Sequence, residues 1–201
     1  MKERGMIFNG EMVRAILDGR RTQTRRPIKW KQTRFTEIGE REDGSKWPWS
    51  EDADHACDFW HPCPFGAVGD RIWVRETWAR YNIDQNSHDI AYRATTPEDW
   101  PEEGRWRPSI HMPRWASRIL LEITNVRVER LNSISQEDAQ AEGMELTGWR
   151  PTYSDQDSGG EAWTPYDNFA QLWESIYGEE SWKANPWVWV IEFKRVVGGA
   201  A

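Results

Sequence analysis

Residues 18–27 (DGRRTQTRRP) constrain the fold most strongly. From Arg20 to Arg26 the segment holds four arginines, two threonines and one glutamine, and no apolar side chain. Hydrophobic packing is therefore not expected to explain it. It is either a solvated, charged edge strand or an anion-binding segment, because the arginine guanidinium presents a rigid fork of donors that fits phosphate or carboxylate.

The charge of the chain is distributed unevenly. The 201 residues carry a net charge of −7, which disfavours a protein that coats nucleic acid without specificity. Residues 1–34 nevertheless hold ten basic and three acidic residues, a charge of +7, and the remaining 16 basic and 30 acidic residues give −14. A basic segment on an acidic body suits a local anionic ligand better than a long duplex.

Length and composition predict one domain over residues 1–201, long enough to bury a core. The 15 tryptophans bury large areas, and we expect some of them to line a pocket or a stacking surface. The amino-terminal residues lack the apolar region of a signal peptide, and no stretch approaches transmembrane length. Two cysteines do not make a disulfide framework. We therefore expect a cytoplasmic protein without membrane association.

Hydrophobic periodicity predicts an α+β fold. Helices are expected at 11–17, at 136–142 and from residue 165 to about 177, and strands at 71–77, near 90–93, at 119–128 and at 187–193. The phase of the strand at 119–128 changes near Asn125. Without βαβ alternation, this order favours a small mixed β-barrel with flanking helices. Long loop insertions are expected near 30–62, 82–108 and 145–163, the first with one hairpin at most.

Two histidines and two cysteines lie within nine residues, at His55, Cys57, His61 and Cys63. These residue types bind zinc, but structural zinc sites usually pair two separated knuckles, and a second cluster is missing from the sequence. The alternative is that they are ordinary loop residues. We expect no metal and no cofactor.

The strand expected at 71–77 places Ile72, Val74 and Glu76 on one face and Arg71, Trp73, Arg75 and Thr77 on the other. The second face is either an edge strand with snorkelling arginines or a pocket wall that stacks and neutralises a nucleotide. An irregular loop at 106–117 adds further candidates. The candidate nucleic-acid- or nucleotide-binding residues are Arg20, Arg25, Arg26, Trp73, Arg75, Trp78, His111, Arg114 and Trp115.

Five motifs follow one another along the chain: AILDGRRTQTR (15–25), GDRIWV (69–74), LEITNV (121–126), AQAEGM (139–144) and VWVIEF (188–193). In this order they resemble the ASCH domain family. The further motifs CPFG, WVRETW and PSIHMPRWASR resemble long members typical of phages and prophages, over nearly the whole chain. The resemblance implies a PUA-like small mixed β-barrel and an association with RNA.

One branch of this family is an amidohydrolase that removes the acetyl group from N4-acetylcytidine with a Lys, a Thr and a Glu. These positions correspond to Arg21, Thr24 and Glu142. Arg21 departs from the pattern, because arginine stays protonated and cannot act as a base or an amine nucleophile; it can still stabilise an oxyanion. Glu142 is then the expected general base, and Thr24 the nucleophile or the residue that positions water.

Several functions stay open at this point. Another branch of the family is a ribonuclease, and four arginines near a hydroxyl and a carboxylate suit that chemistry as well. A non-catalytic module that binds RNA or a modified nucleoside or nucleotide needs only the arginines and an aromatic wall. A phage accessory protein that binds a protein partner through tryptophan-rich loops is the third alternative.

Overall fold

The computed structural model describes residues 1–29, 36–52, 57–81, 89–144 and 164–196. The chain forms two compact units, each assembled from separate stretches of sequence. Unit 1 consists of Met1–Gly19, Pro64–Asn125 and Phe193–Ala201, and unit 2 of Arg20–Cys63 and Val126–Glu192. The division into two units does not test the prediction that residues 1–201 form a single domain.

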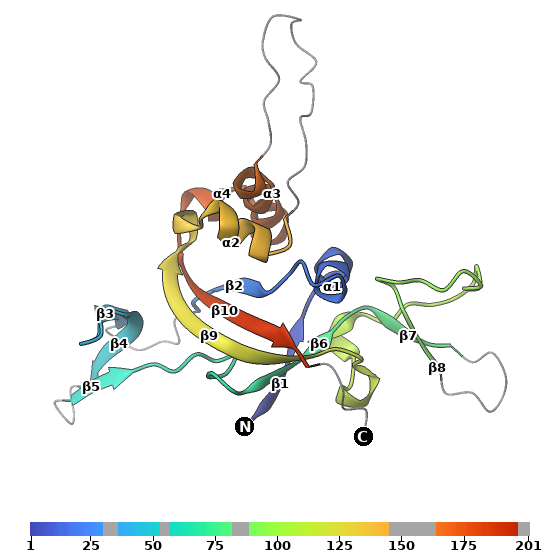
Figure 1. The fold of residues 1–201 in the computed structure, drawn as a ribbon, viewed down its shortest axis with the longest axis horizontal. Coiled ribbons are helices and arrows are strands. Elements are labelled where there is room, and N and C mark those ends of the chain that lie inside the picture. Colours follow the sequence, from blue (N-terminus) through green and yellow to red (C-terminus); the bar gives the residue numbers. More distant parts are fainter. Residues whose placement is uncertain (30–35, 53–56, 82–88, 145–163, 197–201) are drawn as a thin grey trace, which may run out of the picture. The chain divides into compact units, whose positions relative to one another are not determined.

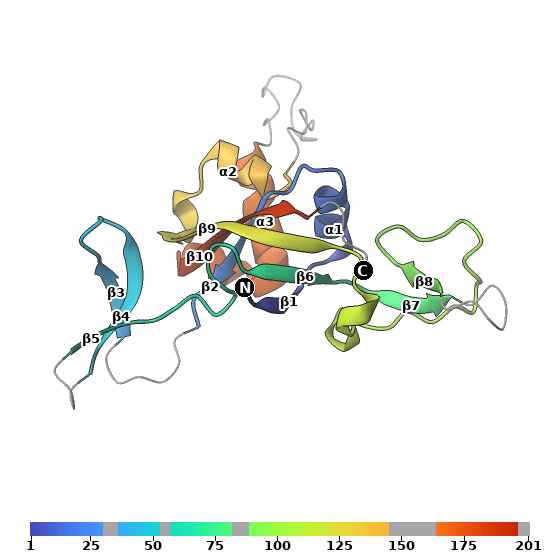
Figure 2. The same cartoon turned by 60° about the horizontal axis from the view of Figure 1, so that its bottom comes forward.

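Three strands form the centre of unit 1. β1 (Glu3–Ile7) pairs in parallel with β6 (Arg71–Arg75), and β6 pairs antiparallel with the first part of β9 (Leu120–Arg130), as Figure 2 shows. Along β6, Ile72 and Val74 are buried and the residues between them are partly exposed. This pattern confirms the two faces predicted for the strand.

Helix α1 (Gly10–Leu17) packs its apolar face into unit 1. The side chain of Asn9 accepts a hydrogen bond of 2.8 Å from the backbone N–H of Met12, which caps the first turn. Four apolar residues of the helix are buried: Met12, Val13, Ala15 and Ile16. Gly19 then adopts a φ of +75°, which glycine reaches without a steric penalty. The predicted helix at 11–17 is confirmed.

In unit 2, β10 (Trp187–Arg195) lies between β9 and β2 (Gln23–Pro27) and pairs antiparallel with β2. Val188 and Val190 pack against the helices, while Trp189 contacts Trp47 edge to face, with ring centroids 5.1 Å apart. Both faces of β10 are thus covered in this unit.

Three helices of unit 2 gather where β9 ends and β10 begins (Figure 1). They are α2 (Gln136–Ala141), α3 (Pro165–Tyr177) and α4 (Glu179–Lys183). Ser135 caps α2, and Thr164 forms a capping box with Asp167 at the start of α3. The core beneath them contains Leu131, Ile134, Ala139, Phe169, Trp173, Val188 and Val190. The helices predicted at 136–142 and from 165 are confirmed within one residue.

The α+β class predicted from the sequence is confirmed, with strands in the majority. The hydrogen-bonded strand order β1-β6-β9-β10-β2 is open, so the described residues form no closed barrel. The buried positions of β9 change phase between Ile123 and Val128, as expected near Asn125. None of the helices that the structure describes is long and apolar enough to cross a membrane.

The first expected insertion contains more regular structure than the sequence predicted. Instead of one hairpin at most, β3 (Thr36–Glu40), β4 (Lys46–Asp52) and β5 (Cys57–Trp60) form a three-stranded antiparallel sheet. Large aromatic side chains compensate for the polar composition, because Trp49 and Trp60 are direct cross-strand partners. The expected insertion at 145–163 lies outside the described residues.

The second expected insertion in unit 1 holds the predicted short strand. β7 (Trp78–Tyr81) pairs with β8 (Asp89–Tyr92). Two single-turn 3₁₀ helices follow, η1 (Ser109–His111) and η2 (Arg114–Ala116), and a third, η3 (Leu131–Ser133), follows β9. Trp78, Met112 and Ala116 form a small core that holds the η1–η2 loop against this hairpin.

Candidate functional site

The basic segment at 18–27 is neither a solvated edge strand nor an open anion-binding strand. Arg21, Gln23, Thr24 and Arg25 are buried, each at most 3% exposed, although β2 lies at the end of the strand order. Arginine is seldom buried without a charged partner. The partners here are carboxylates from α2, from the residue that follows it, and from β9.

The three residues that the resemblance to the amidohydrolase singles out are in contact through Arg21. Its Nη2 atom lies 2.6 Å from Glu142 Oε2 and 3.0 Å from Thr24 Oγ1, and Nη1 donates to the carbonyl oxygen of Glu142. All three side chains belong to unit 2. The structure therefore brings together a guanidinium, a hydroxyl and a carboxylate, two of them 121 residues apart in sequence.

The end of α2 positions the carboxylate. Glu142 is the C-cap of α2, and Gly143 follows with a φ of +90°, a conformation suited to glycine. Arg21 and Glu142 form an isolated antiparallel bridge, and the Thr22 N–H donates to the carbonyl of Ala141 over 2.8 Å. These backbone hydrogen bonds thus hold the segment that carries Arg21 next to the segment that carries Glu142.

Arg25 extends the cluster toward the surface. Its Nη1 lies 3.3 Å from Glu142 Oε1, and its Nη2 lies 2.7 Å from Asp138 Oδ2 and 3.1 Å from Glu129 Oε2. Both carboxylate oxygens of Glu142 therefore have a guanidinium partner, Arg21 on Oε2 and Arg25 on Oε1. The guanidinium of Arg25 is fully buried, whereas Glu129 and Asp138 are about a quarter exposed.

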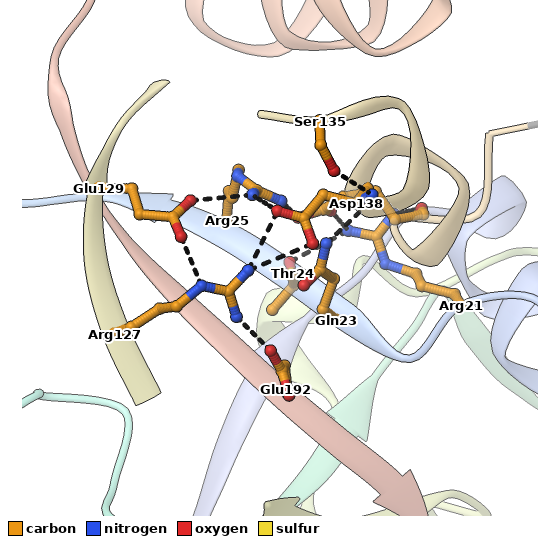
Figure 3. Close-up of polar contacts among 10 residues, drawn as sticks. Arg21, Gln23, Thr24, Arg25, Arg127, Glu129, Ser135, Asp138 and Glu192 are labelled. Carbon is orange, nitrogen blue, oxygen red and sulfur yellow. Dashed lines mark hydrogen bonds and ion pairs between the residues drawn. The ribbon is translucent and has the colours of Figure 1, made fainter. Parts of the chain in front are cut away.

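Arg127 completes this network from β9. Figure 3 shows its guanidinium between Glu129, Asp138 and Glu192. Its Nη2 lies 3.1 Å from Asp138 Oδ2, and its other nitrogens donate to Glu129 and Glu192. Positive and negative side chains alternate from the buried Glu142 to the partly exposed Glu192, so each of the three arginines of this network already contacts at least one carboxylate.

Burial shifts the ionisation of the central pair. Burial raises the pKa of the Glu142 carboxyl above its ordinary value, and the positive charges of Arg21 and Arg25 oppose this rise. Burial also lowers the pKa of Arg21, against the effect of the Glu142 carboxylate. Arginine still keeps its proton at neutral pH. A carboxyl with a raised pKa is a better proton acceptor, which the expected role of Glu142 requires.

The other predicted residues of the basic segment are arranged differently. Arg20 is exposed and donates a hydrogen bond of 3.1 Å to the carbonyl of Gly143, and Arg26 is half-buried. The sequence analysis did not identify Arg127, Glu129 or Asp138 as members of the cluster. Nothing in the sequence next to these residues indicates that they contact the basic segment.

The remaining candidates lie in unit 1, whereas Arg21, Thr24 and Glu142 lie in unit 2. Trp78 is 2% exposed and belongs to the core, which leaves it no free face for a base, whereas Trp115 is 60% exposed. Arg75 lies over Trp73, 5.5 Å from the ring centroid, and donates to the carbonyls of Ser109 and Ile110. The two last candidates, His111 and Arg114, are exposed.

The Cys/His cluster is only partly described. Cys63 is buried, and His61 Nε2 lies 2.9 Å from Ser50 Oγ. Burial lowers the pKa of His61. His55 lies outside the described residues, and within the described ranges no three potential metal ligands lie together.

Comparisons of the chain with protein-family models, with curated proteins and with solved structures find no match. The similarity to ASCH domains therefore depends on the sequence motifs alone.

Proposed function

We propose that the chain is a PUA-like ASCH protein that binds RNA or a modified nucleoside and hydrolyses an amide of this ligand at Arg21, Thr24 and Glu142. One observation carries the proposal: the Arg21 Nη2 atom contacts both Thr24 Oγ1 and Glu142 Oε2. Residues that a sequence resemblance selects have no reason to meet in space unless they occupy corresponding places in the fold. Their contact supports the correspondence.

The chemistry follows from the three groups. Thr24 Oγ, or a water held by it, attacks the carbonyl carbon of an N4-acetyl group, and Glu142 accepts the proton of the attacking oxygen. Arg21 stabilises the negative charge that develops on the carbonyl oxygen, an effect that lowers such barriers by roughly 3 kcal/mol. Glu142 then returns the proton to N4 as the C–N bond breaks. The products are cytidine and acetate, the latter after hydrolysis of an acetyl-threonine if Thr24 attacks directly.

The burial of the cluster sets a condition on this mechanism. Arg21, Thr24 and Glu142 are 3%, 1% and 1% exposed, so the ligand reaches them only after the contact between Arg21 and Glu142 opens. A cation at position 21 that holds the Glu142 carboxylate less tightly than arginine does would ease this opening. Arg21→Lys also restores the lysine that the amidohydrolase branch carries, and we expect it to raise turnover.

The second candidate function is binding without hydrolysis. It is favoured by the two guanidiniums on Glu142, which occupy both carboxylate oxygens at 2.6 and 3.3 Å. A carboxylate held in this way is a structural anchor between β2 and α2. The chain would then bind RNA, a nucleotide or a protein partner elsewhere on its surface. Ribonuclease chemistry at this cluster would fail as well, because both carboxylate oxygens of Glu142 are already occupied.

Release of cytidine from N4-acetylcytidine, followed by liquid chromatography, tests the proposal. The variants are Thr24→Ala, Glu142→Gln and Arg21→Lys, with Thr22→Ala as the matched control because Thr22 lies two residues from Thr24 and is exposed. Turnover that is lost in Thr24→Ala and kept in Thr22→Ala supports the hydrolase. Absence of turnover in both the native protein and a folded Arg21→Lys variant overturns it in favour of binding.

A further inference from the structure

We propose that unit 1 carries a stacking site for single-stranded nucleic acid, centred on Trp115 and flanked by Arg80 and Arg107. The choice of nucleic acid as the ligand rests on the proposed function. The residues are independent of it, because all three lie in unit 1 and Arg21, Thr24 and Glu142 lie in unit 2.

Trp115 is exposed on a rigid support. Its side chain is 60% exposed, although tryptophan gains more than most residues from burial. Its ring meets the buried ring of Trp78 edge to face, with centroids 5.7 Å apart and an interplanar angle of 87°. The loop beneath it is held by the buried Met112 and Ala116, and the Tyr92 hydroxyl donates to the carbonyl of Ala116 over 2.9 Å. An exposed aromatic ring that is fixed before binding loses little conformational entropy when a base stacks on it.

Each ring of this pair has an arginine over one of its faces. The Arg80 guanidinium carbon lies over the Trp115 ring, 5.6 Å from its centroid, and that of Arg107 lies over the Trp78 ring, 5.3 Å from its centroid. The backbone of Arg107 pairs with Trp78 through hydrogen bonds of 2.7 and 3.2 Å, which fixes where its side chain begins. Both arginines are exposed.

These two guanidiniums differ from others in unit 1. Arg114 pairs with Glu3 at 2.9 Å, and Arg118 pairs with the buried Glu76 at 2.9 Å. Over the described parts of the chain, the side chains of Arg80 and Arg107 form neither an ion pair nor a hydrogen bond. The N–H donors of both guanidiniums are therefore available to an anion that lies next to the pair of tryptophans.

An aromatic face beside uncommitted arginines fits one nucleotide unit of a single strand. The base stacks on the indole, and the guanidiniums contact the adjacent phosphates. A duplex does not present the faces of its bases, so a single strand is the expected form. The net charge of −7 favours contact with a few phosphates over a long electrostatic track.

Fluorescence anisotropy with a labelled single-stranded oligouridine of about 10 nucleotides, a length within the range of single-strand sites, measures the binding. We expect Trp115→Ala to weaken it by about 5- to 150-fold, the range typical of removing one base–aromatic stack. Trp115→Phe should keep most of the affinity. Ile110→Ala is the matched control, because Ile110 lies in the same loop and is also 60% exposed.

The salt dependence tests the arginines. Replacement of Arg80 and Arg107 by Gln should lower the slope of the logarithm of affinity against the logarithm of salt concentration by about 1.4, since each phosphate that an arginine neutralises contributes about 0.7 to the slope. Lys183→Gln, an exposed change on α4 of unit 2, should leave the slope unchanged. Thermal melts show whether each variant is folded.

The proposal is overturned if folded Trp115→Ala binds the oligouridine as the native protein does. It is also overturned if a duplex binds equally well, or if an acidic peptide displaces the RNA at equal charge concentration, since this would assign the surface to a protein partner. These measurements read affinity rather than turnover. A failure of hydrolysis at Thr24 is therefore distinguishable from a failure of binding at Trp115.

Discussion

Asp138 Oδ2 lies 2.7 Å from Arg25 Nη2, and through this contact the first turn of α2 is joined to β2. The same arginine reaches Glu142 at the opposite end of that helix, 3.3 Å from Oε1. One buried guanidinium on β2 therefore contacts carboxylates at both ends of α2. The predicted hydrolase cluster and the support of the helix share this side chain.

Loss of the Arg25 charge should destabilise the protein strongly. Arg25→Gln leaves the buried Glu142 with one cationic partner, Arg21, and removes one of the two guanidiniums that contact Glu129 and Asp138. Removal of one member of a buried ion pair costs about 3–5 kcal/mol. We expect a loss of about 3 kcal/mol in the free energy of unfolding, measured by urea denaturation.

Arg127→Gln is the matched control for this prediction. Arg127 contacts Glu129 and Asp138 as Arg25 does, but its side chain is 28% exposed and Arg25 is fully buried. Water replaces part of what an exposed guanidinium contributes, so its loss should cost only about 1 kcal/mol. Equal losses in the two variants would contradict the assignment of the effect to burial.

Asp138 should make the stability depend on pH in the acid range. Burial acts to raise the pKa of this carboxyl, but the guanidiniums of Arg25 and Arg127 outweigh it and hold the pKa below its ordinary value. The folded pKa is thus lower than the unfolded one, which is about 3.9. The stabilisation is present above the unfolded pKa and is lost as the pH falls through the folded pKa.

We therefore expect the stability difference between the native protein and Asp138→Asn to be constant from about pH 5 to 7 and to shrink below about pH 4. Urea denaturation at a series of pH values measures this difference. Other carboxyl groups are present in both proteins and cancel. A difference that grows toward acid pH would show that the pKa of Asp138 is raised rather than lowered.

Local signals explain which helices the sequence predicted correctly. Asn9, Ser135 and Thr164 each cap a helix within their own three or four residues, so a short window of sequence contains the cause and the result. The apolar spacing of α3 points to Phe169 and Trp173, which are buried. The strand at 71–75 was likewise recognisable from its alternation.

Distant partners explain what the sequence did not predict. Because no apolar residue stands near Arg21 and Arg25, the sequence predicted that their segment is either solvated or binds an anion. Instead, both arginines are buried against carboxylates that lie 104 to 121 residues away. Composition shows that those acidic residues exist and gives no indication of which arginine each one meets. The β3–β4–β5 sheet was missed for a related reason, since the register that pairs Trp49 with Trp60 joins two segments that are polar when read alone.

The capping box of α3 should contribute measurably to stability. The Thr164 N–H donates to Asp167 Oδ2 over 2.9 Å, and the Asp167 N–H donates to Thr164 Oγ1 over 3.3 Å. Thr164→Ala should lower the free energy of unfolding by about 1 kcal/mol. Ser175→Ala, an exposed change within the same helix, should lower it by less than about 0.5 kcal/mol. Thermal melts of the two variants compare them, and an equal cost would show that the cap contributes nothing specific.

Arg41 should hold the β3–β4–β5 sheet together through its contacts with two tryptophans. Its guanidinium carbon lies 4.2 Å from the ring centroid of Trp47 and 5.2 Å from that of Trp60. A cation over an aromatic face contributes about 0.5–1 kcal/mol at partly exposed sites. Arg41→Gln should therefore speed amide hydrogen exchange in β3 and β4 by about 2- to 5-fold, since local opening reports the stability of these strands.

Lys46→Gln is the control for this effect. Lys46 forms an ion pair with Glu40 in the same hairpin, but both side chains are about half exposed, and such pairs contribute little. Its amide exchange should change by less than about 2-fold. If the Lys46 and Arg41 variants exchange at the same rate, the charge of the hairpin rather than the contact with Trp47 and Trp60 stabilises the sheet.

A slower exchange in Arg41→Lys than in Arg41→Gln would show that a cation at this position is sufficient, and equal rates would assign the effect to the planar stack of the guanidinium.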